Sequence, residues 1–132
     1  MNQAQDEVVG FGFSKAKQLV KTDEISSVFS FNSRFSSEHF QVLAKPGIYE
    51  FARMAVIVSK KTARHATVRN YIKRVSREVF RLQQPRLDGL DMVIRIRKSF
   101  SPAEYAVIEQ ELKTQFDRVR QKFTLPEKQN TL

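Results

Sequence analysis

The sequence predicts an α+β fold in which about three helices pack on a small central mixed β-sheet. Apolar residues recur with helical spacing over residues 67–84 and 101–123, which favours two amphipathic helices. Residues 38–45 and 91–98 alternate between apolar and polar side chains, as half-buried strands do. Residues 54–58 form a short apolar run, which is typical of an interior strand. We expect the strands before and after the first long helix to lie in one sheet, side by side and parallel.

The first expected element is a short helix over residues 22–29, which Thr22 can cap. Ile25 and Phe29 fall on one side of this helix. The following segment, residues 30–37, is rich in serine and asparagine. It predicts a turn or the ragged start of a strand.

In the strand over residues 38–45, Phe40 and Val42 point one way, while Gln41 and Leu43 point the other. Pro46 and Gly47 should end this strand. The helix that follows the apolar run starts near Thr67, which is a reasonable N-cap.

The last helix has a clear start signal. Ser101 and Glu104 are spaced as a capping box, and Pro102 occupies the first helical position. Glu111 is expected on the solvated face of this helix, and residues 125–132 are expected to form a frayed tail.

The 132 residues, 41% of them hydrophobic, suit a single domain with one core. We expect that core to span about residues 11–123, after a loose leader over residues 1–10. No apolar run approaches the roughly 20 residues that cross a bilayer, and the acidic N-terminus does not resemble a signal peptide. The absence of cysteine excludes disulfides, thiol catalysis and cysteine-based zinc sites. We therefore expect a cytoplasmic protein.

The strongest functional signal is positive charge. The chain has 23 lysines and arginines against 14 acids, a net charge of +9, which points to a polyanionic partner. Cations recur every four residues of the first long helix, opposite its apolar stripe, at Arg69, Lys73, Arg77 and Arg81. A charged row of this kind is often only a solvated surface. We favour a polyanion-binding face, because Glu78 is the only acid in the helix.

Two consecutive segments, MAVIVSKK at 54–61 and ATVRNYIKRVSRE at 66–78, resemble the signature of the protein subunit of bacterial ribonuclease P. That family has an SKK strand end, then an A-x-x-R-N-R-x-K-R helix followed by R-E. Residues 22–29 resemble its short first helix, and residues 91–98 resemble its strand after the basic helix. The resemblance covers roughly residues 11–123.

The resemblance implies a protein that assists a catalytic RNA in removing the 5′ leader of precursor tRNA. It implies that the catalytic centre lies in the RNA, that Mg²⁺ is held mainly by the RNA, and that one protein binds each RNA. It also implies a fold like domain 2 of ribosomal protein S5, with a left-handed strand–helix–strand crossover. General rules alone would favour a right-handed crossover in about 98% of cases.

Matching the family's motif position by position gives an RNA-contacting set: Lys60, Lys61, Arg64, Arg69, Asn70, Lys73, Arg74 and Arg77. The family also holds the leader in a cleft between its first helix and the sheet, where the matching residues are Ile25, Phe29, Phe40 and Leu43. Tyr71 departs from the family, which usually has arginine there. Its ring could stack on a base or close the edge of the core. No metal ligands on the protein can be named.

Three alternative functions use the same residues differently. One is a structural RNA-binding protein of the ribosomal type, without a role in processing. Another is a DNA-binding module that places the basic helix in the major groove. The third is a protein ribonuclease with His39 and His65 as an acid–base pair, although nothing in the sequence orients either ring.

Overall fold

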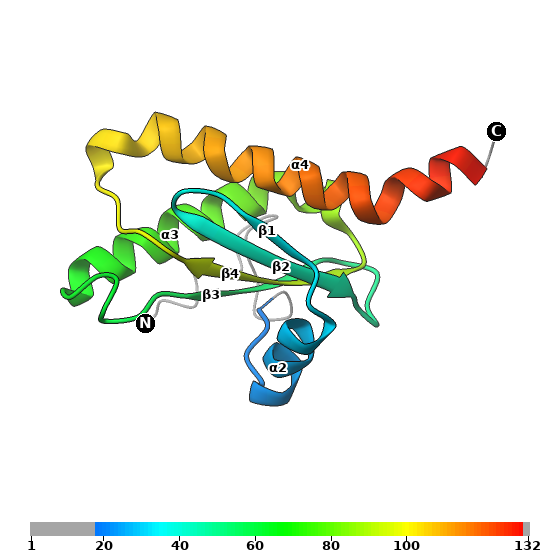
Figure 1. The fold of residues 1–132 in the computed structure, drawn as a ribbon, viewed down its shortest axis with the longest axis horizontal. Coiled ribbons are helices and arrows are strands. Elements are labelled where there is room, and N and C mark those ends of the chain that lie inside the picture. Colours follow the sequence, from blue (N-terminus) through cyan, green and yellow to red (C-terminus); the bar gives the residue numbers. More distant parts are fainter. Residues whose placement is uncertain (1–17, 131–132) are drawn as a thin grey trace.

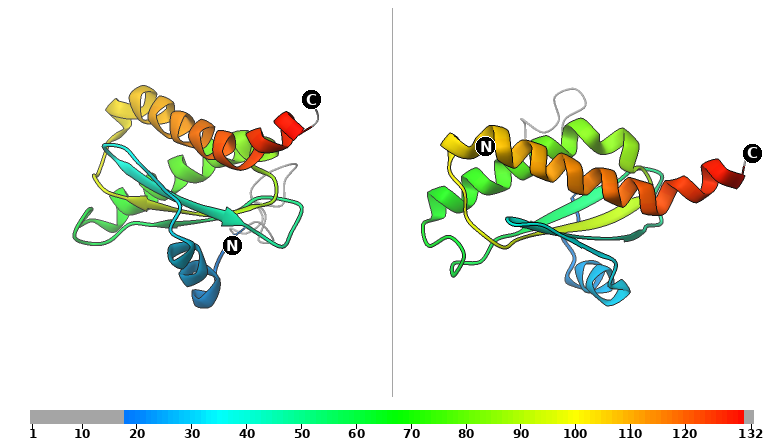
Figure 2. Two further views of the ribbon diagram at one scale, coloured as in Figure 1. Left: turned by 45° about the vertical axis from the view of Figure 1, so that its right-hand side comes forward. Right: turned by 45° about the horizontal axis from the view of Figure 1, so that its top comes forward.

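The computed structural model describes residues 18–130, and side chains as far as residue 123, so the expected leader lies outside the described residues. The chain forms three layers, with α2 on one face of a sheet and with α3 and α4 on the other (Figures 1 and 2). Its elements are α2 (Thr22–Phe31), β1 (Arg34–Ser36), β2 (Phe40–Pro46), β3 (Arg53–Ile57), α3 (Ala66–Gln83), the 3₁₀ helix η2 (Gln84–Leu87), β4 (Leu90–Ile96), the 3₁₀ helix η3 (Pro102–Glu104) and α4 (Tyr105–Asn130). The predicted α+β class is confirmed. Within residues 18–130, no helix is long and apolar enough to cross a membrane.

The described strands form one mixed sheet in the order β1-β2-β4-β3. The β1–β2 and β2–β4 pairs are antiparallel, whereas β3 and β4 are parallel, with Met54 opposite Met92. The predicted parallel pairing across the first long helix is therefore confirmed. The left-handed sense of that crossover stays a prediction.

The prediction that residues 54–58 form an interior strand is wrong, because β3 lies at the edge of the sheet. Its apolar run has another cause, which is that both of its faces are covered. Met54 belongs to the larger core cluster, and Ala55 packs against the smaller one. The chain before α2 also covers part of the edge, since the backbone N–H of Leu19 donates to the carbonyl of Met54 at 3.0 Å.

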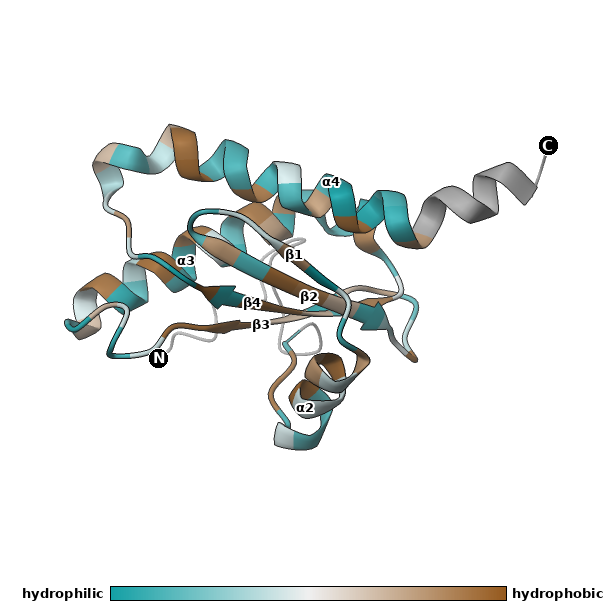
Figure 3. Ribbon diagram, viewed as in Figure 1, coloured by the Kyte–Doolittle hydropathy of each residue, from teal (hydrophilic) through white to brown (hydrophobic). Residues whose placement is uncertain are grey.

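Two hydrophobic clusters lie on opposite faces of the sheet, whose strands are largely hydrophobic (Figure 3). The larger cluster lies between the sheet and the helices α3 and α4, and the smaller one lies between the sheet and α2. The predicted alternation in β2 is confirmed, since Phe40 and Val42 enter the larger cluster and Leu43 enters the smaller. On the second face Gln41 and Lys45 are polar and half-buried, whereas Leu43 is covered by α2.

The predicted N-caps are both wrong by one or two positions. Lys21 and His65 precede α2 and α3 with extended backbones, so Thr22 and Thr67 lie inside the first turns. Neither capping residue makes a side-chain hydrogen bond to its helix. Threonine is a preferred N-cap residue, but the conformation of the preceding loop determines the residue at which the helix begins.

The predicted capping box before α4 is confirmed. The backbone N–H of Ser101 donates to Glu104 Oε1 at 2.9 Å, and the helix opens with a 3₁₀ turn. The prediction of a frayed tail from residue 125 is wrong, because α4 continues to Asn130. The apolar stripe marks where a helix packs, and backbone hydrogen bonding can run beyond that point.

Glu111 is not on a solvated face, as the sequence suggested, but holds α4 to the start of β2. Its carboxylate accepts hydrogen bonds from the Ser37 hydroxyl and from the backbone N–H of His39 at 2.8 Å. The Nδ1 atom of His39 lies 2.7 Å from Glu111 Oε1, and the ring is 4% exposed. These contacts bind the β1–β2 connection to the helical layer.

Glu111 should make stability fall in acid. Burial raises the pKa of its carboxyl, but the hydrogen bonds from Ser37 and His39 outweigh this and lower the pKa below its ordinary value of 4.5. The stabilisation is complete above pH 4.5 and is lost as the pH falls through the lowered pKa. We expect the free energy of unfolding to decrease over that range in the native chain and to decrease less in a Glu111→Gln variant. Equal acid dependence of the two proteins, measured by urea unfolding, would contradict this assignment.

Candidate RNA-binding site

The packing of α3 decides which of its side chains reach solvent. Ile72, Val75 and Val79 are buried in the larger cluster, as the apolar spacing predicts. Phe80 is fully buried beside them. Leu82, which extends the predicted stripe, is 50% exposed because the chain leaves the sheet near the end of α3. The opposite face of α3 is therefore free to carry charge.

Most of the predicted cations have no partner among the residues that the structure describes. Within the described residues, no side-chain hydrogen bond or ion pair engages the following members of the predicted set: Lys60, Lys61, Arg64, Lys73, Arg74 and Arg77. All of them are exposed except Lys73, which is half-buried. Asn70 is also exposed. All of these positions therefore reach solvent, Lys73 only in part.

Several cations elsewhere in the described structure are paired with acids. Arg53 is buried and donates to Asp91, with its Nη2 2.9 Å from Oδ2. Arg81, at the far end of the α3 row, lies 2.6 Å from Glu78. That hydrogen bond lowers the pKa of Glu78, so the pair stays ionised. Within the described residues no acid pairs with the other cations of the α3 row, which therefore keeps an uncompensated positive field.

Arg69 differs from its neighbours because it has a structural task. Its Nη1 donates to the carbonyl oxygens of Ala63 and Arg64, at 2.9 and 2.8 Å. These bonds hold the loop between β3 and α3, which contains Lys60 and Lys61. Arg69 is therefore a positioning residue for the other cations.

The predicted cleft residues do not come together as a set. Ile25 and Phe29 are half-buried on α2 and pack against the smaller cluster, to which Leu43 belongs. Phe40 lies on the opposite face of the sheet and is fully buried in the larger cluster. Its assignment to this cleft is wrong, because neighbouring residues of a strand point to opposite faces. Leu43 is on the correct face but is fully covered.

The α2 side of the sheet instead presents polar groups that residue-by-residue matching missed. Gln41 and Arg95 are directly opposite each other on β2 and β4. Together with Arg97, Lys61 and Ile57 they line an open pocket of about 500 Å³. The alternation of β2 and β4 could have found these residues, since Gln41 and Arg95 occupy the positions that face away from the larger core.

The described residues contain no group of three or more His, Asp or Glu side chains that could hold a metal ion. The expectation that Mg²⁺ is held mainly by RNA stays a prediction. His39 is buried against Glu111, and His65 is exposed at the start of α3. His39 is therefore inaccessible to a substrate, which removes the basis for an acid–base pair.

The sequence model of the Ribonuclease P family matches residues 13–120. The chain belongs to this family. A ribonuclease P protein component from Chromobacterium violaceum is 47% identical over 96 residues, which are 73% of this chain and 79% of the relative. Another, from Azoarcus sp., is 38% identical over 109 residues, 83% of this chain and 91% of the relative. The resemblance found in the sequence is thereby confirmed.

A solved structure of the Staphylococcus aureus RNase P protein superposes with a TM-score of 0.69 at 24% identity. The match covers 80% of this chain and 96% of that protein. At this level of identity the likeness shows the fold alone. It supports the arrangement of layers described above for this ribonuclease P family member.

The positioning role of Arg69 can be tested by hydrogen exchange. An Arg69→Ala variant should expose the amides of Thr62 and Ala63, which are bonded to the Ser59 carbonyl at 3.1 and 3.0 Å, to faster exchange. Arg74→Ala is the matched control, because it removes an arginine with no described partner. Equal exchange of this loop in both variants would contradict the role of Arg69.

Proposed function

We propose that this chain is the protein subunit of a ribonucleoprotein ribonuclease P, which binds the catalytic RNA and assists removal of the 5′ leader from precursor tRNA. Membership of the family supports the subunit role. The observation that carries the proposal is the row of unpaired cations on α3. RNA phosphates would supply the negative charge that is missing from this face of the protein.

The chemistry of the α3 face suits an RNA backbone. The guanidinium group of Arg74 can donate two parallel hydrogen bonds to one phosphate. Asn70 can both donate and accept, which suits a 2′-hydroxyl. None of the exposed cations has to leave an internal ion pair before it binds. Association would therefore gain charge pairing without first breaking protein contacts.

The α2 side of the sheet is the proposed place for the single-stranded leader. Arg95, Arg97 and Lys61 offer cations there, and Gln41 offers a neutral hydrogen-bonding group. Phe29 is half-buried at the border, so stacking contributes less than phosphate contacts. The leader would thus be held with little dependence on its sequence.

We place the catalytic centre and most of the Mg²⁺ in the RNA, with one protein for each RNA, in the cytoplasm. The protein's part would then be electrostatic and geometric. Cations that bind both the catalytic RNA and the substrate lower the repulsion between two polyanions. The protein should increase the rate of processing most at low Mg²⁺ concentration, where few ions screen the repulsion between the two RNAs.

Processing of a precursor tRNA at low Mg²⁺ tests this role. The catalytic RNA and the protein together should release the leader efficiently, and either alone should not. RNA binding without stimulation would favour the alternative of a structural RNA-binding protein. Cleavage by the protein alone would contradict the placement of the catalytic centre.

The α3 face can be tested by a charge-matched pair of variants. Arg74→Ala should weaken binding of the catalytic RNA by about 1–3 kcal/mol, as expected for one strong phosphate contact. Lys113→Ala removes the same charge from α4, where Lys113 lies 3.6 Å from Glu109, and should change binding little. Filter binding at fixed salt measures both, with duplex DNA as competitor. Equal affinity of the two variants, or a preference for duplex DNA, would count against the proposal.

The proposed leader site predicts a selective effect. Arg95→Ala should weaken binding of precursor tRNA to the assembled enzyme and leave mature tRNA, which lacks a leader, unaffected. We expect about a 10- to 100-fold loss, typical of one hydrogen bond to a charged group. Parallel losses for both tRNAs would show that Arg95 acts elsewhere.

A further inference from the structure

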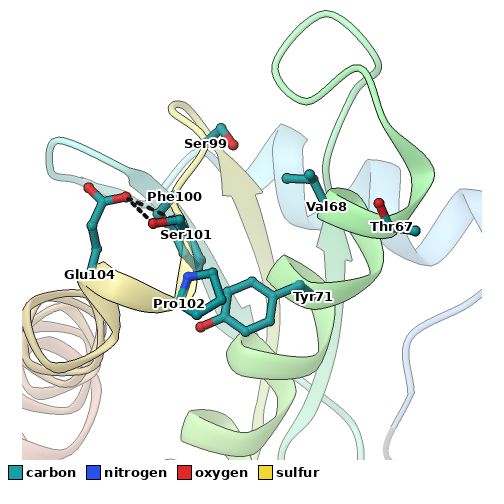
Figure 4. A pocket seen from close by; sticks show the side chains of 8 residues that line it. All are labelled: Thr67, Val68, Tyr71, Ser99, Phe100, Ser101, Pro102 and Glu104. Atoms are coloured by element: carbon teal, nitrogen blue, oxygen red, sulfur yellow. Dashed lines mark hydrogen bonds between the residues drawn. The ribbon is translucent and has the colours of Figure 1, made fainter.

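A second pocket, of about 470 Å³, lies between the start of α3 and the segment that joins β4 to α4. It is separate from the α2 side of the sheet. Figure 4 shows its lining, which is Thr67, Val68, Tyr71, Ser99, Phe100, Ser101, Pro102 and Glu104. Its size is in the range of small-ligand sites in proteins.

The floor of this pocket is aromatic and fixed in place. Tyr71 is half-buried and meets Phe100 edge-to-face, with ring centroids 6.1 Å apart. Phe100 is 3% exposed and is itself packed against Phe40, at 5.7 Å. Pro102 is exposed and lies close to the Tyr71 ring (Figure 4). A flat apolar ring would therefore meet a preformed surface.

The rim of the pocket is polar. Thr67, Ser99 and Ser101 contribute hydroxyl groups. Glu104 Oε1 accepts from the backbone N–H of Ser101 at 2.9 Å in the capping box. Figure 4 shows this carboxylate turned toward Ser101 and away from Tyr71, so the hydroxyl groups supply the polar part of the rim. A ligand with an apolar face and hydrogen-bond donors on its edge would satisfy both parts.

The pocket adjoins the unpaired cations of α3. Asn70 and Arg74 flank Tyr71 on the helix, and both are exposed. Arg64 lies just before the helix and is exposed as well. A ligand that fills the pocket while its charged part meets these groups must combine a flat ring with a phosphate. A nucleotide has both.

We propose that this pocket takes one unstacked base of the RNA strand that binds along α3. The base stacks on Tyr71 beside Pro102, and its phosphates meet Arg74 and Arg64. This inference rests on the proposed RNA-binding role. Tyr71 stands where the family usually has arginine. In this proposal one side of its ring closes the edge of the core, and the other side stacks on the base.

Oligocytidine and oligouridine of equal length test which part of the base the pocket binds, because they carry the same phosphates. Stacking uses the face of the ring and not its edge, so the full chain should bind both with similar affinity. An abasic oligonucleotide of the same length keeps the phosphates and lacks the ring. It should bind about 5- to 100-fold more weakly, as expected for the loss of one base–aromatic stack. Equal binding of the abasic oligonucleotide would overturn the proposal.

Substitutions of tyrosine test the stacking. Tyr71→Ala should weaken binding of oligocytidine and of the catalytic RNA by about 5- to 100-fold, as loss of one base–aromatic stack does. Tyr71→Phe should retain binding. Tyr105→Ala is the matched control, since Tyr105 is half-buried against the same core without lining the pocket. Thermal unfolding shows whether each variant is folded.

The outcomes distinguish this proposal from the proposed function. If the native chain binds neither oligonucleotide nor the catalytic RNA, the RNA-binding role itself fails. If it binds the catalytic RNA and Tyr71→Ala binds equally well while folded, only the base pocket fails, and Tyr71 serves the core alone. Equal weakening by Tyr71→Ala and Tyr105→Ala would likewise assign Tyr71 to the core and overturn the pocket.

Discussion

The burial of one face of α3 against the sheet is the constraint on which the rest of the structure depends. Each Val or Ile that this face buries contributes about 1.5–3 kcal/mol, whereas each like-charged pair on the other face costs only a few tenths. The apolar contacts therefore determine how α3 is oriented on the sheet, and the cations face solvent. Among the described residues only Glu78 pairs with a cation of this row, Arg81. The exposed charge is a consequence of how the core is built.

The arrangement gives α3 two different borders. On one side Arg77 reaches the edge strand β3 near α2 and lines a groove there with Ile25. On the other side Thr67, Val68 and Tyr71 line the pocket before α4. At the start of the helix, Arg69 fixes the loop that carries further cations. A single helix thereby contacts both the sheet-edge region and the start of α4, and an RNA bound along it would meet both.

Local patterns were enough to predict much of this. The alternation of β2 and β4, the capping box at Ser101 and the two long amphipathic helices depend on neighbouring residues, and the structure confirms them. The failures depend on contacts between distant segments. The edge position of β3 is set by strand order, and the burial of Glu111 is set by Ser37 and His39, 72 or more residues away. Phe40 was misplaced because sequence matching ignored which face it occupies.

The dependence of RNA binding on salt tests the central claim most directly, namely that the unpaired cations of α3 neutralise RNA phosphates. The affinity of the native chain for the catalytic RNA should fall steeply as salt rises. Replacing Lys73, Arg74 and Arg77 together by alanine should make the slope of log K against log salt shallower by about 0.7–0.9 for each contact removed. A variant that folds normally and keeps the native slope would contradict the account, because other residues would then neutralise the RNA phosphates.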